Sequence, residues 1–245
     1  RRRGKPHVHS GPATDPGAGN VISGNTGNGV GLGPPNAVGN VILGNYIGVD
    51  ATGTVALGND IGVWVDNVAD NTIGGTEAGA RNVISGNREG ITLWEAGATG
   101  NLIQGNYIGT SATGDEALPN GFGIPIYAPG NIVGGTEPGA GNLISGNLAI
   151  GVNFYGAAAT GNTVQGNLIG TDASGTTALG NGEQGVAMID APGNTIGGTE
   201  SGAGNVISGN MMSGVFLLGE PTRSTLIQGN FIGTDPTGTM AVGNG

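Results

Sequence analysis

Residues 71–87 read NTIGGTEAGARNVISGN, and this stretch decides the fold because the chain repeats it. Close copies occupy residues 131–147 and 194–210, and the phrase NVISGN also occurs at residues 20–25. A second phrase, NLIQGNYIG at residues 101–109, has relatives that begin at Asn40, Asn162 and Thr225. These phrases recur every 60 to 63 residues. Self-similarity at a fixed period indicates a repeat architecture, in which neighbouring units bury a shared core.

Each long period divides into two halves, and each half contains three short aliphatic segments. From Asn71 these segments are residues 72–73, 83–84 and 91–93. Three short strands make one triangular coil. The sequence therefore predicts an all-β fold: a single-stranded, right-handed parallel β-helix of about seven to eight coils, roughly 30 residues and three strands per coil. Residues 1–245 are expected to form one domain, with a basic leader or linker at 1–6 and an incomplete last coil from about residue 225.

Side chains alternate across a strand, so the repeated aliphatic residues are expected to line the inside of the coils. The second strands predict one continuous ladder: Ile22, Ile47, Ile84, Ile108, Ile144, Ile169, Ile207 and Ile232. The third strands predict two more, Val30, Val63, Ile91, Ile124, Val152, Val186 and Val215 beside Leu32, Val65, Leu93, Ile126, Phe154, Met188 and Leu217. One coil cannot bury these residues alone, so stacking at about 4.8 Å per coil is expected to form the core.

Asparagine recurs at the corners between strands. One row reads Asn20, Asn45, Asn82, Asn106, Asn142, Asn167, Asn205 and Asn230. Another row reads Asn25, Asn59, Asn87, Asn120, Asn147, Asn181, Asn210 and Asn244. Asn tolerates tight turns and can hydrogen-bond to the coils above and below, so both rows are interpreted as structural ladders.

Two kinds of loop alternate along the repeat. Odd coils carry a Gly-Thr-Glu loop such as residues 75–80, and even coils carry a longer loop such as residues 170–180. Both kinds are expected to cover the outward apolar column of the second strands: Val21, Tyr46, Val83, Tyr107, Leu143, Leu168, Val206 and Phe231.

The composition excludes several functional classes. Seventeen Asp and Glu residues against seven Lys and Arg residues give a formal charge of −10. Nucleic acid is disfavoured as a partner, because phosphate binding needs a basic surface. The apolar runs are too short to cross a bilayer, so no membrane insertion is expected. Because the chain has no Cys, disulfides and thiolate chemistry are excluded.

The Asn-x-Ile-x-Gly-Asn phrase and the Gly-Ile-x-Leu segments resemble the parallel β-helix repeats of the pectate-lyase-like superfamily. The Gly-Thr-Asp loops and the phrase at residues 71–77 resemble repeats of large bacterial surface and secreted proteins. The resemblance covers nearly the whole chain beyond Asn20. It implies right-handed coils and no single activity, because that superfamily includes lyases, hydrolases, epimerases, adhesins and passive stalks.

The chain departs from what the resemblance implies for an enzyme. Lyases of the superfamily use clustered calcium-binding acids beside Arg or Lys, and its polygalacturonase-type hydrolases use adjacent Asp residues. Beyond residue 5 the basic side chains are Arg81, Arg88 and Arg223, and no Asp-Asp pair exists. Both departures count against catalysis.

The outward position after the third strand carries the most informative residues. Trp94, Tyr127 and Tyr155 occupy it on three consecutive coils and are predicted to form an exposed aromatic stripe. Aromatic faces beside carboxylates suit sugar rings. The predicted carbohydrate-binding residues are therefore Trp64, Asp66, Trp94, Glu95, Tyr127 and Tyr155. The alternative is that the stripe packs against a loop, a neighbouring domain or another chain.

Asp66 and Glu95 form the best carboxylate pair, because they lie on adjacent coils near both Trp residues. Paired acids can serve as acid and base in glycoside hydrolysis. Isolated acids are common on solenoid surfaces, so the favoured interpretation is two solvated turn residues.

Metal sites have weaker support. Asp50, Asp172 and Asp235 lie in Gly/Thr-rich loops whose oxygen atoms suit Ca²⁺, but one acid per loop favours Asx-turns instead. The equivalent position in the fourth coil is Ser111. His7 and His9 alternate on the first coil, and two ligands without a third rarely bind a metal. No other cofactor is expected.

These patterns favour a non-catalytic extracellular module of a bacterial surface or secreted protein, acting as rigid spacer and interaction surface. Its expected partner is a polysaccharide or another surface protein. The coil ends are expected to be flanked by further repeats or by another chain, because open strand edges normally need covering. The alternative is a lyase, glycoside hydrolase or epimerase acting on polysaccharide around Asp66 and Glu95. Ice binding is disfavoured, because the outward Thr72, Thr163 and Thr195 do not occupy consecutive coils.

Overall fold

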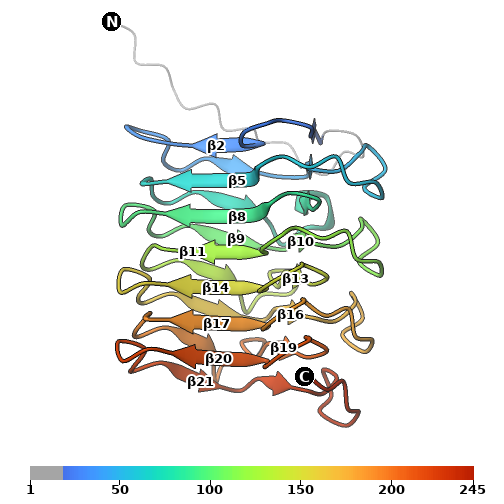
Figure 1. The fold of residues 1–245 in the computed structure, drawn as a ribbon, viewed down its shortest axis with the longest axis vertical. Helices are drawn as coiled ribbons and strands as arrows, with labels where there is room; N and C mark the ends of the chain where they lie inside the picture. The colour runs from blue at the N-terminus through green and yellow to red at the C-terminus, as the bar shows by residue number, and fades with distance from the viewer. Residues whose placement is uncertain (1–18) are drawn as a thin grey trace, which may run out of the picture.

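The structure, a computed structural model, describes residues 19–245. Three parallel sheets wind into one solenoid of about seven turns, in which the strand arrows stack with the same direction (Figure 1). The one helix of the described residues is the three-residue 3₁₀ turn η1 (Ala78–Ala80), and none of their helices is long and apolar enough to cross a membrane. The predicted all-β solenoid with about 30-residue, three-stranded coils is confirmed.

Each sheet collects one strand from every coil. Sheet C holds β3 (Val41–Ile42), β6 (Thr72–Gly74), β9 (Leu102–Gln104), β12 (Ile132–Gly134), β15 (Thr163–Gln165), β18 (Thr195–Gly197) and β21 (Leu226–Gln228). Sheet A holds β1 (Val21–Ile22), β4 (Tyr46–Ile47), β7 (Val83–Ile84), β10 (Tyr107–Ile108), β13 (Leu143–Ile144), β16 (Leu168–Ile169), β19 (Val206–Ile207) and β22 (Phe231–Ile232). Sheet B holds β2 (Val30–Leu32), β5 (Ile61–Asp66), β8 (Glu89–Trp94), β11 (Ile124–Ile126), β14 (Val152–Tyr155), β17 (Val186–Ile189) and β20 (Val215–Leu218).

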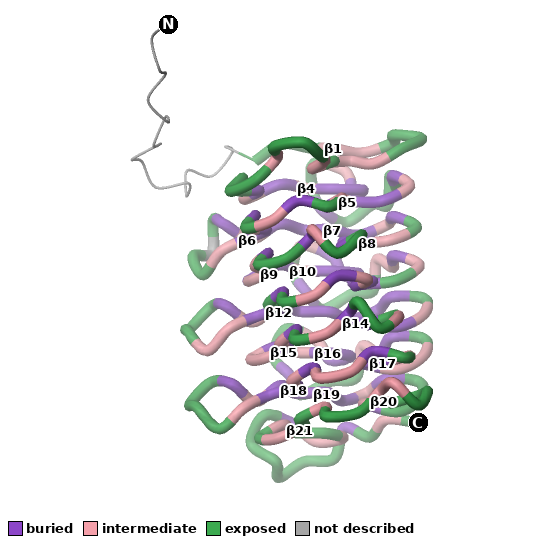
Figure 2. The backbone as a smooth tube through the Cα atoms, turned by 90° about the vertical axis from the view of Figure 1, so that its left-hand side faces the viewer, coloured by how far each residue is buried: buried purple, intermediate pink, exposed green. Residues whose placement is uncertain are grey.

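The core consists of the predicted aliphatic ladders. Strand register pairs Ile22 with Ile47 and continues the same column to Ile232, and the ladder is fully buried from Ile47 to Ile207. Sheet C supplies a third wall: Ile42, Ile73, Ile103, Val133, Val164 and Ile196. The last coil is different, because Ile232 is 45% exposed although it belongs to the inner ladder. Figure 2 shows buried residues through the middle coils and mostly exposed ones in the last coil.

The asparagine rows form hydrogen-bonded ladders as predicted. Asn82 donates its backbone N–H and its side-chain Nδ2 to Oδ1 of Asn106, at 3.3 and 2.9 Å. Asn106 repeats the pair of bonds to Oδ1 of Asn142. The structure adds a third ladder before sheet C, formed by Asn40, Asn71, Asn101, Asn131, Asn162 and Asn194. In all three rows the Asn-to-Asn hydrogen bonds run toward the coil that follows in sequence, while Nδ2 groups such as that of Asn82 also donate to a carbonyl of the preceding coil.

Proline interrupts sheet B at one place. Pro125 is the central residue of β11, and a proline has no N–H to donate to a neighbouring strand. Strands β8 and β11 consequently share one register pair, Leu93 with Ile126, whereas β5 and β8 share five. Sheet B therefore has its fewest register pairs between the coils that carry Trp94 and Tyr127.

The two kinds of loop lie on either side of the outer face of sheet A and cover its apolar column as predicted in the middle coils, whereas Val21 and Phe231 at the two ends of the column are exposed. The even-coil loops are small hairpins, closed by antiparallel bridges such as Thr110 with Ala117. They approach the column so closely that a methyl group on Gly53 would lie 2.7 Å from the Tyr46 ring. A methyl group on Gly114 would likewise lie 2.8 Å from Tyr107. These two positions therefore require glycine.

Loops of the same kind contact each other although a whole coil separates them in the chain. In the even-coil row, Ala112 donates its N–H to Gly53 O at 3.0 Å, and Ala173 donates to Gly114 O at 3.0 Å. In the odd-coil row, a methyl group on Gly139 would lie 2.2 Å from Thr76 O. Each row is thus a continuous wall with a period of two coils. The basic leader at residues 1–6, His7 and His9 lie outside the described residues.

Candidate functional site

The predicted aromatic stripe exists as a row of touching rings on the outer face of sheet B. Asp66 and Trp94 are register partners on β5 and β8, and Tyr155 continues the column on β14. The Trp94 and Tyr127 ring centroids lie 4.7 Å apart, and those of Tyr127 and Tyr155 lie 5.9 Å apart. Contacts of this length are typical of stabilising aromatic pairs.

The stripe is stepped rather than flat. Its successive rings are inclined by 64° and 59°, so each ring presents part of a face or an edge instead of joining one plane. Trp94 is 41% exposed and Tyr155 is 51% exposed, while Tyr127 between them is half-buried. The column continues with Ile189 and the exposed Leu218, which extend the apolar surface over two further coils.

Trp64 lies on the same face but in the neighbouring column. Its register partners are Gly31 and Thr92. Further along this column, Pro125 pairs with Asn153. The Oδ1 atom of Asn153 is the one buried side-chain polar atom of the described residues that has no hydrogen-bond partner. Trp64 therefore widens the surface at one end without belonging to the row of touching rings.

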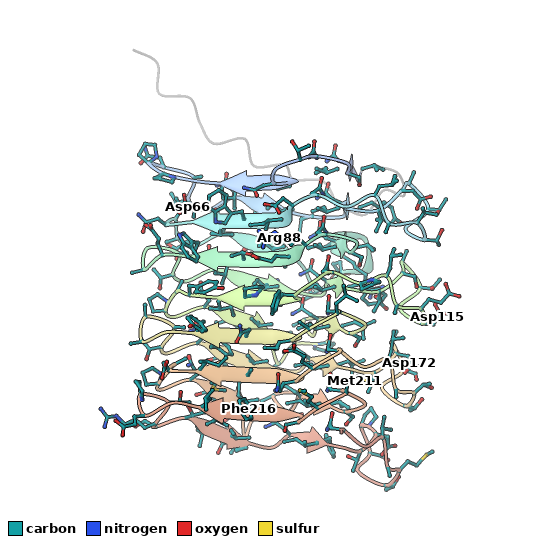
Figure 3. All side chains as sticks on the ribbon, viewed as in Figure 1. Asp66, Arg88, Asp115, Asp172, Met211 and Phe216 are labelled. Carbon is teal, nitrogen blue, oxygen red and sulfur yellow. The ribbon has the colours of Figure 1, made fainter. Side chains whose placement is uncertain are left out.

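Carboxylates flank the stripe at the ends of the strands. Asp66 is half-buried at the end of β5, and Glu95 is exposed directly after Trp94. Glu95 adopts a φ of 63°, a left-handed conformation typical of a tight turn. The predicted neighbours on adjacent coils are thus found on adjacent coils. Figure 3 shows Asp66 on the face of the upper sheet B strands.

A second charged group, which the sequence analysis missed, lies where the sheet B strands begin. Arg88 donates from Nε to Asp60 Oδ1 at 2.6 Å and also pairs with Glu89 (Figure 3 labels Arg88). Glu89 Oε2 accepts a hydrogen bond from the buried Thr92 hydroxyl at 2.6 Å. The hydrogen bond from Arg88 lowers the pKa of the Asp60 carboxyl.

Glu89 connects this charged group to the aromatic stripe. Burial raises the pKa of the Tyr127 phenol, and the negative charge of Glu89 raises it further. Glu89 lies two residues before the inner residue Ile91, so the strict alternation of a strand would place its side chain inside the coil. Its ion pair with Arg88 and its bond to Thr92 are local corner contacts that the repeat does not encode.

The loop carboxylates are held by their own loops. Asp50 Oδ1 accepts the N–H groups of Thr54 and Val55, and Thr52 donates its hydroxyl to the same carboxylate. The hydroxyl bond from Thr52 is the main cause of the lowered pKa of Asp50. Asp172 and Asp235 repeat this arrangement with their own loop residues.

The fourth coil shows how the loop tolerates a different residue. Ser111 replaces the aspartate, and Asp115 accepts hydrogen bonds from Ser111 and Thr113. Figure 3 shows Asp115 and Asp172 on loops at the same edge of the molecule. Within the described part of the chain, no three His, Cys, Asp or Glu side chains are grouped as a metal site. The aspartates hold their loops through hydroxyl groups and through N–H groups four and five residues later, instead of the N–H two residues later that an Asx-turn uses.

Comparison with protein-family models, with curated proteins and with solved structures finds no match to this chain.

Proposed function

We propose that this chain is a rigid extracellular solenoid module that binds polysaccharide along the aromatic stripe. The proposal rests on one observation: three aromatic rings touch in a row across three successive coils, and the two outer rings are exposed. The sequence supplies only ten Phe, Trp and Tyr side chains, so their concentration on one sheet calls for a reason. Aromatic faces bind the apolar faces of sugar rings, and a straight solenoid presents such contacts at regular steps.

The polar groups around the stripe fit this ligand. Asp66, Glu95 and Glu89 offer carboxylate oxygens, which accept hydrogen bonds from hydroxyl groups. These acids lie at both ends of the strands that carry the rings. A polysaccharide lying along the stripe would meet apolar faces beneath its sugar rings and acceptors beside them. This combination separates the sheet B face from the loop-covered face of sheet A.

The first test is affinity gel electrophoresis of the protein through gels that contain neutral or acidic polysaccharides. The Trp94→Ala/Tyr127→Ala variant is compared with the native chain, and Phe231→Ala serves as a matched control on another sheet. We expect one polysaccharide to retard the native chain and the control alike. We expect the double variant to bind at least about tenfold more weakly, since each lost ring removes well over 1.4 kcal/mol of apolar burial.

Equal retardation of the native chain and the double variant would contradict the stripe as the binding site. No retardation by any polysaccharide would favour a spacer whose stripe contacts another protein. The catalytic alternative is tested with the same ligand: formation of unsaturated or reducing ends, lost in Asp66→Ala and Glu95→Ala, would replace binding with cleavage. If the polysaccharide is bound without being cleaved, the binding function stands.

A further inference from the structure

Arg81 breaks the repeat at a position that is otherwise always glycine. The residue before each asparagine of the sheet A row reads Gly19, Gly44, Arg81, Gly105, Gly141, Gly166, Gly204 and Gly229. At the equivalent odd-coil positions, a methyl group on Gly141 would lie 1.9 Å from Gly166 O, and one on Gly204 would lie 2.0 Å from Gly229 O. A side chain is thus admitted at residue 81 only because the backbone differs there.

The difference is visible in the preceding loop. This loop forms the 3₁₀ turn η1, whereas the equivalent loops at residues 136–140 and 199–203 contain only bends and turns. Arg81 directly follows η1 with a φ of −61°, and its Nε lies 3.4 Å from the carbonyl oxygen of Gly105. The chain therefore departs from its own repeat around a single cationic side chain.

The guanidinium lies over an aromatic ring and beside a hollow. Its Cζ is 3.9 Å from the centroid of Tyr107, a cation–π distance. A hollow of about 250 Å³ opens next to this pair on the outer face of sheet A, between the two loop walls. Leu143, Leu168 and Ala173 line it together with glycine backbone. One wall of the hollow is thus cationic, glycine backbone contributes polar surface, and the Leu168 and Ala173 side chains contribute a smaller apolar part.

No carboxylate of the described residues forms an ion pair with Arg81. Both ion pairs of residues 19–245 belong to Arg88, and Arg223 is exposed to solvent. Asn142, the other polar side chain at the hollow, is already committed, because it donates to Ile103 O and Asn167 Oδ1 and accepts from Asn106. A half-buried guanidinium without a counter-ion has lost part of its hydration and gains from an anionic partner.

We propose that this hollow binds a small organic anion of the carboxylate class. Its carboxylate pairs with the free edge of the Arg81 guanidinium, and its apolar body lies against Leu168 and Ala173. The site is on sheet A and is independent of the aromatic stripe on sheet B. The net charge of −10 opposes anions at long range, but salt screens that repulsion beyond about 8 Å, so the local pairing decides binding.

The test uses benzoate as the probe and ligand-observed saturation-transfer NMR on the full chain at physiological salt. We expect a benzoate signal with the native chain that weakens at least tenfold in Arg81→Gly. This variant restores the residue that the repeat uses elsewhere, so it should fold. Arg81→Gln keeps a side chain of similar length without the charge and should lose the signal equally. Arg223→Gly removes a different arginine and should bind as the native chain does.

Two further probes define the ligand class. Benzamide has the same ring without the negative charge, and inorganic phosphate has the charge without an apolar body; both should bind much more weakly than benzoate. An unchanged benzoate signal in Arg81→Gly, equal binding of benzamide, or no benzoate signal at all would overturn the proposal. Phosphate that displaces benzoate at equal concentration would overturn the assignment to an organic anion.

Discussion

At the residue scale, the asparagine ladders are the most demanding feature of the molecule. An interior asparagine such as Asn106 accepts two hydrogen bonds from Asn82 and donates two to Asn142, and its Nδ2 also contacts Ile73 O and Gln104 O. All these groups are buried or nearly so. No other residue type supplies both functions at this size, because aspartate lacks the donor and serine the reach.

Asn106→Ala is expected to destabilise the chain strongly. It leaves the Nδ2 and N–H of Asn82 without their acceptor and Ile73 O without a donor, and each unsatisfied buried group costs about 1–3 kcal/mol. We expect the unfolding free energy to fall by about 3–5 kcal/mol, measured by urea unfolding followed by circular dichroism. Asn20→Ala, at the exposed start of the same row, should cost about 1 kcal/mol. Equal losses at the two positions would contradict the ladder's role.

Some features of the two candidate sites follow from the repeat in the sequence, and others depend on packing in the folded chain. Trp94, Tyr127 and Tyr155 could be placed in one outward column from the sequence, because register follows from the repeat. Their mutual tilt could not, since it depends on the side-chain conformation that each ring adopts against its neighbours. The hollow beside Arg81 was equally hidden: the glycine column identifies the exception, but the space next to it arises from loops two coils apart.

At the element scale, the even-coil loops are closed by their own carboxylates. Burial alone would raise the pKa of Asp172, but hydrogen bonds from Ser174, Thr177 and Thr176 outweigh it and lower the pKa. The folded loop therefore favours the charged carboxylate. Because the folded pKa lies below the unfolded one, this stabilisation is complete above the ordinary pKa of about 4 and is lost as the pH falls through the lower, folded value.

Asp172→Asn is accordingly expected to lower stability at pH 7 by up to about 1 kcal/mol, and this loss should shrink as the pH falls from about 4 toward about 2. The measurement is the thermal unfolding midpoint of both chains across this pH range. Glu137→Gln, in the other loop row, serves as the control and should follow the native profile. A difference that persists unchanged at low pH would show that the charge of Asp172 does not stabilise the loop.

The elements also show where patterning succeeds and where it fails. The short strands, their order and their inner residues follow from alternation, and Ile84 and Leu93 are both fully buried as expected. The incomplete pairing of β8 with β11 was not anticipated, although Pro125 is plain in the sequence. A periodic pattern specifies which side chains point inward, but it does not specify which backbone donors are missing.

At the scale of the whole molecule, each coil is stabilised by its contacts with the neighbouring coils. Each coil is hydrogen-bonded to the coil before it and the coil after it, so interior coils are held on two sides. The inner residue of β22, Ile232, is exposed, whereas the inner residue of β13, Ile144, is fully buried. Within the described chain, the free energy of local opening is therefore expected to differ between the middle coils and the last coil.

Hydrogen exchange should reveal this difference. The amide of Ser145, bonded to Ile108 O in the middle of sheet A, should exchange at least about tenfold more slowly than that of Gly233, bonded to Ile207 O in the last coil. The measurement is native-state exchange by NMR or mass spectrometry on the same chain. Uniform protection of both amides would mean that the solenoid opens only as one unit.

The two loop walls carry a consequence for length. Each loop contacts a loop of its own kind two coils away, so a single added or deleted coil would change the spacing between loops in both rows and break both walls. Growth and shrinkage are therefore quantised: the smallest interchangeable segment is one pair of coils, 60 to 63 residues, or about 10 Å of axial reach. The length of the solenoid can therefore change only in steps of two coils, although the coil is its structural repeat.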